Sequence, residues 1–315
     1  MPIAPAMPLL AVPNVSEGRD PALLDVLARA FDATGAARLL DVHADPDHHR
    51  SVFTLAAPQR HLATAVLAGA RVAIERIDVM SGPQARERGE HPHVGALDVA
   101  PVVYLGASQR GAACAEALVL AHEIGELGVP VLLYGELAQG RTRAALRRGG
   151  VSELAERLHA GELQPDFGPS RPHPTAGTTL VAAREPLVAF NLELSAPATL
   201  ADAQRIAALI REGGAEGMPG LRAIGIALRS DDTRAHAPGA EALSERPVAQ
   251  VSTNVERPLE TPLLAVLEAV ARHAPVARAE LVGLAPRAAL ADFPADVPWR
   301  GGDPAAQTLE NALGF

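Results

Sequence analysis

Residues 89–99, GEHPHVGALDV, hold the most reactive combination of side chains in this sequence. They place the imidazole of His91 next to Glu90 and ahead of Asp98, with glycine and proline bending the chain before an apolar run. Histidine is the side chain whose ordinary pKa lies nearest neutrality, and catalytic groups favour loops held by a rigid scaffold. We therefore predict that His91 is a general acid/base and that Glu90 and Asp98 are catalytic with it, as carboxylates that can stabilise a cationic nitrogen of the substrate.

A second group of histidines lies in the segment HADPDHHR, ahead of another apolar run. His43, His48 and His49 alternate there with aspartates, which is a composition that metal sites use. The spacing matches no established zinc signature such as H-E-x-x-H, so we expect no metal, and these imidazoles are then exposed or hydrogen-bonded to a substrate. Arg50 ends the segment, where its forked guanidinium suits a bidentate carboxylate contact. A surface ion pair with a nearby aspartate explains Arg50 equally well.

Polar residues also interrupt apolar surroundings in both halves of the chain. Asn14 and Glu17 follow the first apolar run, where turn chemistry explains the asparagine without a function. Gln250, Ser252 and Asn254 alternate along one predicted strand and therefore share one of its faces. A polar stripe on a strand face favours a wet cavity over a dry core, so we predict that all of these residues contact substrate.

The elements that must position these side chains form two similar halves. Asp20 precedes a helix with Pro21 at its first position, which is the usual N-terminal signature. The other elements expected in the first half are strands at 8–12, 38–43, 51–57, 97–105 and 129–135 and helices at 60–76 and 109–127. The second half is expected to have strands at 187–194, 221–229, 248–257 and 280–285, a helix at 200–211, and a helix capped by Thr261 with Pro262 at its first position.

Both halves spell β-α-β-β-α-β, the ferredoxin-like order. We predict an α+β protein with two such subdomains, residues 1–183 and 184–315, whose sheets face each other across a cleft. The Pro/Gly-rich segment 165–177 between the halves forbids regular structure and is either a stiff linker or a functional wall. Residues 231–245 form a polar insertion to which the sequence assigns no role.

Composition excludes several classes of function. The chain has 315 residues, a formal net charge of −9 and no basic run, which argues against nucleic-acid binding. All 28 basic residues are arginine, so Schiff-base chemistry and a P-loop lysine are excluded. The single cysteine, Cys114, precludes an internal disulfide and fits a buried spectator thiol. The first ten residues lack the positive region of a signal peptide, and no apolar run approaches the length of a membrane span, so we expect a cytoplasmic protein.

Seven ordered blocks, covering nearly the whole chain, resemble the glutamate formimidoyltransferase family in its stand-alone form, without a cyclodeaminase domain. The blocks are VPNVSEGRD (12–20), LLDVHADPDHHRSVFTL (39–55), GEHPHVGALDVAPVVYLG (89–106), VPVLLYGE (129–136), PDFGPS (165–170), LVAFNLEL (187–194) and AQVSTNV (249–255). The resemblance implies transfer of a formimidoyl group between 5-formimidoyltetrahydrofolate and L-glutamate, in histidine breakdown or related one-carbon metabolism. It implies two α/β subdomains in a homodimer, with His91 as the catalytic residue and without a metal.

The resemblance also implies a folate-binding wall within the segment 165–177. Its residues are Gly168, Pro169, Ser170, Arg171, Pro172, His173, Pro174, Thr175, Ala176 and Gly177. The chain departs from the family where it has His43 for an acidic residue, His49 for asparagine, and Arg171, His173 and Thr175 for aromatic residues. Those departures leave two other functions open, namely a metal-dependent hydrolase of a formimidoyl or formyl amino acid, and a folate-binding protein without turnover.

Overall fold

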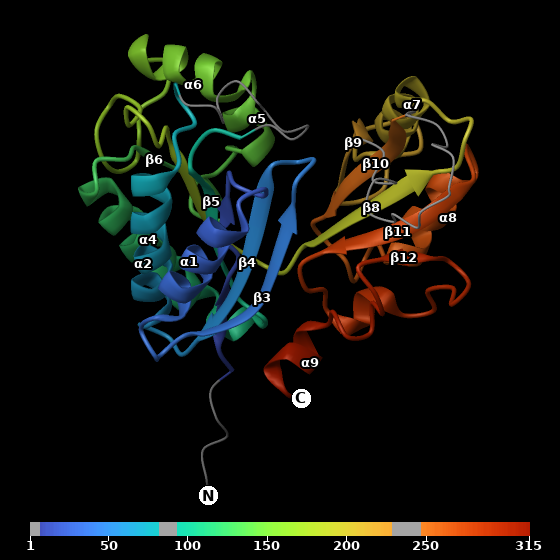
Figure 1. Cartoon of the computed structure of the whole chain (residues 1–315), viewed down its shortest axis with the longest axis horizontal. Helices are drawn as coiled ribbons and strands as arrows, with labels where there is room; N and C mark the ends of the chain where they lie inside the picture. Colours follow the sequence, from blue (N-terminus) through green and yellow to red (C-terminus); the bar gives the residue numbers. More distant parts are fainter. Residues whose placement is uncertain (1–6, 82–92, 229–246) are drawn as a thin grey trace, which may run out of the picture. The chain divides into compact units, whose positions relative to one another are not determined.

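The computed structural model describes residues 7–81, 93–228 and 247–315. The chain divides into two compact units between Glu185 and Pro186. Each unit contains one β-sheet with helices packed on it, so the predicted α+β class is confirmed (Figure 1). Every helix in the described residues is too short or too polar to span a bilayer.

The first unit is built on a seven-stranded sheet. Its strands are β1 (Leu9–Ala11), β2 (Asn14–Val15), β3 (Arg38–Asp45), β4 (Arg50–Ala57), β5 (Leu97–Val103), β6 (Val131–Gly135) and β7 (Thr179–Arg184). β1 and β2 follow one another along a single strand position of the sheet, and both pair antiparallel with β4 on one side and β5 on the other. β3 pairs with β4, while β7 lies between β5 and β6 and runs parallel to both.

Helices cover both faces of this sheet. They are α1 (Pro21–Asp32), α2 (Leu62–Arg76), the 3-10 turn η1 (Ala107–Gln109), α4 (Arg110–Glu126), α5 (Arg143–Arg147) and α6 (Gly150–His159). The side chain of Asp20 accepts hydrogen bonds from two backbone N–H groups of the first turn of α1, as the N-terminal signature predicts. Alternate residues of β6 enter different cores: Leu133 packs with α1, α2 and α4, whereas Tyr134 packs with α5 and α6.

The segment 165–177 belongs to the first unit and is not a linker between the halves. Asp166 N–H donates to Val131 O at 2.9 Å, and Val131 N–H donates to Phe167 O at 2.9 Å, so the segment covers the outer edge of β6. Strand β7 follows it directly, and the sequence analysis missed this strand together with α5 and α6. The apolar stretch of β7 is short and follows a run of glycine and proline, which hides it from periodicity.

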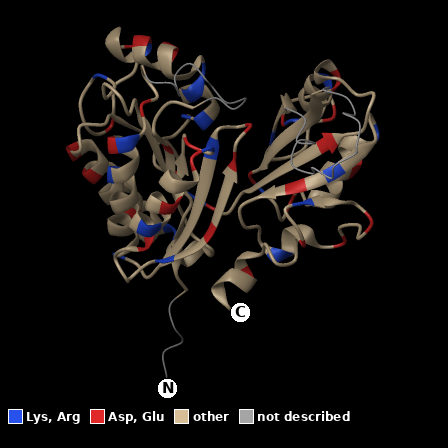
Figure 2. Ribbon diagram, viewed as in Figure 1, with Lys and Arg blue, Asp and Glu red and all other residues tan. Residues whose placement is uncertain are grey.

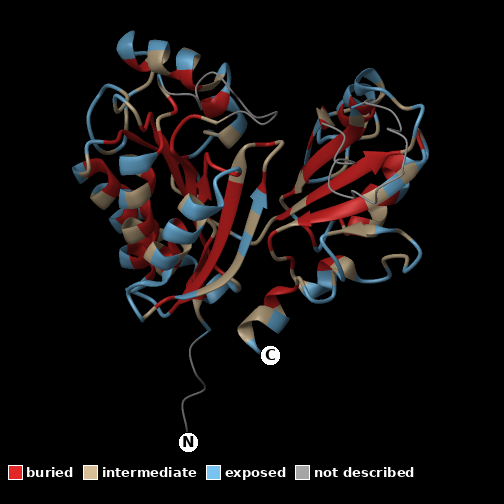
Figure 3. Cartoon of the chain, in the orientation of Figure 1, coloured by how far each residue is buried: buried red, intermediate tan, exposed pale blue. Residues whose placement is uncertain are grey.

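The second unit is a five-stranded sheet with the order β12-β11-β8-β10-β9. Its elements are β8 (Val188–Leu194), α7 (Leu200–Ile210), β9 (Leu221–Leu228), β10 (Val248–Val255), α8 (Leu263–Ala271), β11 (Val276–Val282), the 3-10 turn η3 (Arg287–Leu290), β12 (Trp299–Arg300) and α9 (Leu309–Leu313). Helices α7 and α8 cover one face, where alternate strand residues such as Phe190 and Val251 form the core. In both units the strands are largely buried and the helices expose their outer surfaces (Figure 3).

Two expectations for the second unit were wrong. Thr261 does not cap α8, because Pro262 is its N-cap and the Thr261 hydroxyl donates to Pro219 O at 2.7 Å. The last predicted strand runs over Val276–Val282 rather than 280–285, and Ala285 instead forms an isolated bridge with Thr308. The helix therefore begins one residue later than predicted, and Thr261 lies outside it.

Candidate functional site

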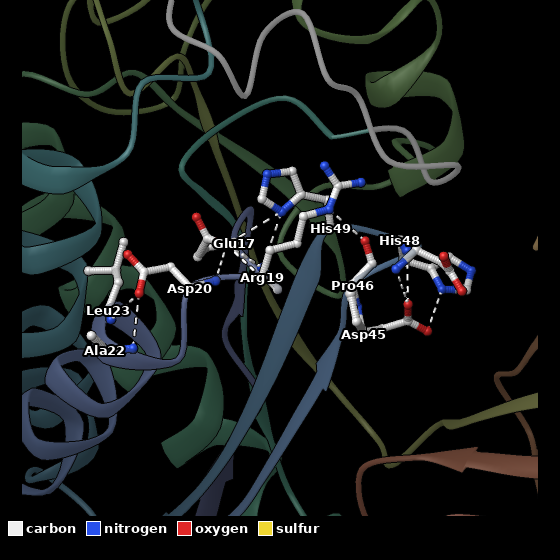
Figure 4. Close-up of polar contacts among 11 residues, drawn as sticks. Glu17, Arg19, Asp20, Ala22, Leu23, Asp45, Pro46, His48 and His49 are labelled. Carbon is white, nitrogen blue, oxygen red and sulfur yellow. Dashed lines mark hydrogen bonds and ion pairs between the residues drawn. The ribbon is translucent and has the colours of Figure 1, made fainter. Parts of the chain in front are cut away.

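The loop between β2 and α1 is organised around a buried carboxylate. Glu17 Oε1 accepts hydrogen bonds from the backbone N–H groups of Gly18, Arg19 and Asp20, at 2.9, 2.7 and 3.0 Å (Figure 4). One carboxylate oxygen thus accepts from three consecutive backbone donors just before the helix. Glu17 therefore holds the shape of the loop, and Asp20 starts the helix that follows it.

The β3–β4 hairpin packs directly on this loop. Gly18 N–H donates to His49 Nδ1 at 3.2 Å, and Glu17 Oε1 lies 3.5 Å from the same nitrogen. A Cβ on Gly18 would lie 2.3 Å from the backbone oxygen of Asp45 and 2.6 Å from the backbone nitrogen of Arg50, so only glycine allows the loop and the hairpin to approach this closely. His49 has a φ of 47°, a conformation in which histidine and asparagine are enriched.

Within the hairpin, Asp45 fixes the imidazole of His48. His48 Nδ1 and Asp45 Oδ2 lie 2.6 Å apart, and both residues are buried. The other oxygen of Asp45 accepts the N–H groups of Asp47 and His48, at 2.8 and 2.9 Å (Figure 4). A carboxylate bonded to Nδ1 orients an imidazole so that its Nε2 atom is available for proton transfer or hydrogen bonding.

Burial changes the acid–base behaviour of neighbouring groups on β3 and β4. It raises the pKa of Asp41, although His43 opposes the effect. It lowers the pKa of His43, against the attraction of Asp45 and Asp41, so His43 is neutral at pH 7. Burial and the positive charge of Arg147 lower the pKa of Arg50 to about 9, and Arg50 still carries its charge at pH 7. Ligand atoms of His43 and Asp45 lie within 4.8 Å of each other.

Asp98 lies at the start of β5 and is fully buried. Its Oδ1 atom accepts the N–H of Val94 at 2.9 Å, and its Oδ2 atom forms an ion pair with Arg147 of α5. Asp98 thus ties the chain that enters β5 to a helix on the sheet's second face. His91 and Glu90, three and four residues before Val94 in the sequence, lie outside the described residues.

The end of the segment 165–177 packs beside this same entry to β5. His173 and Gly177 exchange backbone hydrogen bonds at 2.9 and 3.1 Å, and Ala96 N–H donates to Ala176 O at 2.9 Å. His173 Nδ1 accepts the N–H of Ala176 at 3.1 Å, which closes the turn. Residues 168–171 are exposed, whereas Ala176 and Gly177 are buried. The predicted folate wall is therefore a hairpin-like turn anchored at its C-terminal end.

Asn14, the first residue of β2, is buried, and its Nδ2 atom donates to Val12 O at 3.0 Å. Next to it, the Ser16 hydroxyl donates to Gly95 O at 2.7 Å. These bonds join the loop after β2 to the residues just before β5. Turn and strand geometry account for Asn14, which was the alternative reading of its sequence position.

The helix-free face of the second sheet is polar. Gln250 lies opposite Glu193 and Ser252 opposite Asn191, and Asn254 continues the same face. Arg278 and Arg300 both pair with Glu193, and Asn191 donates to Glu280 at 3.0 Å. Gln250 is fully buried, and neither of its amide atoms has a hydrogen-bond partner among the described residues. An unsatisfied buried amide at this position can both donate to and accept from a ligand.

The sequence analysis missed Arg143, Arg147 and Tyr134, which gather near Asp98. Arg147 and Asp98 are 49 positions apart, so no local pattern connects them. The available signal was the segment RTRAALRR, which holds four arginines within residues 141–148. A dense group of arginines can equally form a solvated surface, and the sequence alone does not distinguish such a surface from a buried cluster.

Comparison with known families now identifies the class of protein. The family described as "Formiminotransferase domain, N-terminal subdomain" matches residues 9–184, which is the first unit almost in full. The chain belongs to the formiminotransferase family.

Similar proteins extend the match into the second unit. The chain is 33% identical over 294 residues to the glutamate formimidoyltransferase of Streptococcus pyogenes serotype M1, covering 89% of this chain and 90% of that protein. It is 33% identical over 295 residues to the glutamate formimidoyltransferase of Thermoplasma acidophilum, with 89% of each chain covered. It is 38% identical to the formimidoyltransferase-cyclodeaminase of Sus scrofa, of whose length it spans only 50%.

Proposed function

We propose that this protein is a folate-dependent transferase that moves a formimidoyl group between 5-formimidoyltetrahydrofolate and L-glutamate. The observation that carries the proposal is the match to two proteins named glutamate formimidoyltransferase along about nine-tenths of their length. The formiminotransferase family match to the first unit supports it. Tetrahydrofolate is then a substrate that carries the one-carbon group.

The chemistry needs a proton acceptor and then a proton donor. The glutamate amine loses a proton to His91, and its lone pair attacks the formimidoyl carbon to give a tetrahedral adduct. When the adduct collapses, the bond from carbon to N5 of the pterin breaks, and His91 returns the proton to N5 as it leaves. General acid–base catalysis of this kind contributes about 10²–10⁴-fold in rate.

The other candidate residues bind or position the reactants in this proposal. Glu90 stabilises the cationic nitrogen of the formimidoyl group, and Arg50 binds a carboxylate. Asp98 is a positioning residue, because its fully buried carboxylate holds the N–H of Val94 near the end of the segment that contains His91. The turn at 168–177 binds folate.

On the second unit, we assign the polar sheet face with Gln250, Ser252 and Asn254 to substrate contact. Two features support this assignment: the amide of Gln250 is buried and unsatisfied within the described residues, and Ser252 and Asn254 share its face. Asn14 in β2 and Glu17 in the loop after it contribute to substrate binding by fixing the conformation of the backbone with their side-chain hydrogen bonds. We further propose that the protein acts as a homodimer in the cytoplasm, and light scattering of the purified protein tests the dimer.

The deciding experiment is an assay of chelator-treated protein with tetrahydrofolate and N-formimidoyl-L-glutamate, following glutamate release and formimidoyltetrahydrofolate formation. We expect turnover that requires folate and survives the chelator. Folate-independent glutamate release that is lost with the chelator would instead indicate a metal hydrolase. Tetrahydrofolate binding without turnover would indicate a folate-binding protein.

A variant pair then tests the proton-transfer role. His91→Ala should lower kcat by about 10²-fold or more while tetrahydrofolate binding is retained. His159→Ala is the matched control, since this imidazole is exposed at the end of α6 and bonds to its own helix. Equal activity in the two variants would remove His91 from the mechanism.

A further inference from the structure

A buried polar cluster lies beneath α5, on the second face of the first sheet. Arg147 is only 6% exposed, and its ion pair with Asp98 uses one terminal nitrogen of the guanidinium. Its Nε atom is buried without a hydrogen-bond partner among residues 7–81, 93–228 and 247–315. The hydroxyl of Tyr134, on β6, is buried and equally without a partner in the described chain.

Two further arginines surround this cluster. Arg50 is the first residue of β4, and Arg143 is the first residue of α5. Figure 2 shows in blue how the arginines are distributed over the chain. Burial and the like charge of Arg143 lower the pKa of Arg147, and Arg143 and Arg147 act in the same sense on Arg50. The three guanidinium groups therefore lie close enough to repel one another electrostatically.

The nearest aspartate does not satisfy every donor of this cluster. Asp98 already accepts hydrogen bonds from Arg147 and from the Val94 N–H. A buried N–H of a charged group that lacks an acceptor is costly, and a bound anion would supply an acceptor for Arg147 Nε.

We propose that Arg147 Nε, the Tyr134 hydroxyl and the Arg143 guanidinium bind a carboxylate group of the amino-acid substrate. The planar fork of arginine matches a carboxylate, and a tyrosine hydroxyl donates the remaining hydrogen bond. The inference rests on the proposed function and names the element, α5, that would hold glutamate.

The glutamyl tail of folate also carries carboxylates, so the experiment must separate the two sources. We would measure KM and kcat for L-glutamate and for the folate substrate in Arg143→Gln and Tyr134→Phe. Arg148→Gln is the matched control, since this neighbouring arginine is exposed and pairs with Glu153. We expect KM for glutamate to rise about tenfold in each test variant, with kcat and the folate KM within about threefold, and with the control unchanged.

Calorimetric titration with amino acids supplies a readout that does not depend on turnover. We expect the wild type to bind L-glutamate more tightly than at least one of its two monoamides, L-glutamine and L-isoglutamine, and Arg143→Gln and Tyr134→Phe to lose this preference. The amide that binds poorly identifies the carboxylate at the cluster. Circular dichroism confirms that the variants are folded, and Tyr134→Phe removes only one oxygen from the core.

Three results would overturn the inference: an unchanged glutamate KM and affinity in both test variants, an equal change in Arg148→Gln, or a change confined to the folate KM. The last result would assign the cluster to the folate tail. Folate-dependent turnover together with any of them leaves the proposed function intact. Absence of turnover in the wild type contradicts the proposed function, and the titration still decides whether the cluster binds a carboxylate.

Discussion

Replacing Arg147 by methionine should destabilise the first unit strongly, because it leaves the Asp98 carboxylate buried with a single partner. Asp98 is 0% exposed, and without Arg147 the hydrogen bond that remains to it within the described part of the chain is from the Val94 N–H, at 2.9 Å. Removing one member of a buried ion pair costs about 3–5 kcal/mol, more than deleting both members. Methionine fills a similar volume, so the cavity left behind adds little.

The second step of this prediction is rescue by neutralising the remaining charge. Asp98→Asn in the Arg147→Met background keeps an oxygen for the Val94 N–H and removes the buried charge. We expect the double variant to recover about 2 kcal/mol of the free energy of unfolding, with the rest lost to the unsatisfied amide group. Asp98→Asn alone should also be destabilised, because it leaves the Arg147 guanidinium buried without its counter-charge.

Urea unfolding can localise the effect within the chain. Trp299 is the single tryptophan and lies in the second unit, whereas far-UV circular dichroism reports both units. We expect the circular dichroism midpoint of Arg147→Met to fall by about 1 M urea while the part of the transition seen by Trp299 moves less. The reasoning is refuted if Arg147→Met unfolds at the wild-type midpoint, or if the double variant is no more stable than the single one.

Three other expectations follow from local geometry. Burial raises the pKa of Asp41, so the folded state binds the proton of this carboxyl group more tightly than the unfolded state, and the stability gained at low pH is lost as the pH rises through the folded pKa. Asp41→Asn should therefore unfold at a higher temperature than wild type at pH 7, and equal melting temperatures would contradict this. His49→Asn should stay within about 0.5 kcal/mol of wild type at its φ of 47°, whereas His49→Val should lose about 1–2 kcal/mol, as urea midpoints would show unless both fall equally. A Cβ on Gly69 would lie 2.1 Å from the ring of Phe31, so Gly69→Ala should cost about 1–3 kcal/mol, while Gly111→Ala, open within 4 Å, should not lower the melting temperature.

The order of the elements was predictable because the local signals agree with the fold. Asp20 and Pro21 mark the start of α1, and alternating apolar residues mark strands such as β10, whose polar side is Gln250, Ser252 and Asn254. The elements that escaped prediction lie where such signals are short or masked, as in β7 and α5. Propensity and periodicity are local, so an element stabilised chiefly by its neighbours in the sheet leaves little trace in its own residues.

The site was predictable only in part, for a different physical reason. Asp98 stood out by its spacing from His91, but its burial and its pairing with Arg147 depend on contacts far apart in the sequence. Glu17 was predicted to contact substrate because it is an acidic residue in a loop, and in the structure its carboxylate accepts hydrogen bonds from three backbone N–H groups. Residue type indicates what a side chain can do, and only the three-dimensional neighbours decide which of its atoms are already used.

Strand β7 has a consequence for how the protein is made in the cell. It lies between β5 and β6 although it follows both in the chain, so the ribosome releases its neighbours first. From the end of β6 at Gly135 to the end of β7 at Arg184 there are 184 − 135 = 49 residues, which take about 2–10 s to translate. Through that interval the nascent chain presents unpaired apolar strand edges, which invite mispairing with other chains. Chaperones that bind extended apolar segments, or slow growth at low temperature, should therefore raise the yield of folded protein more than any change at its surface.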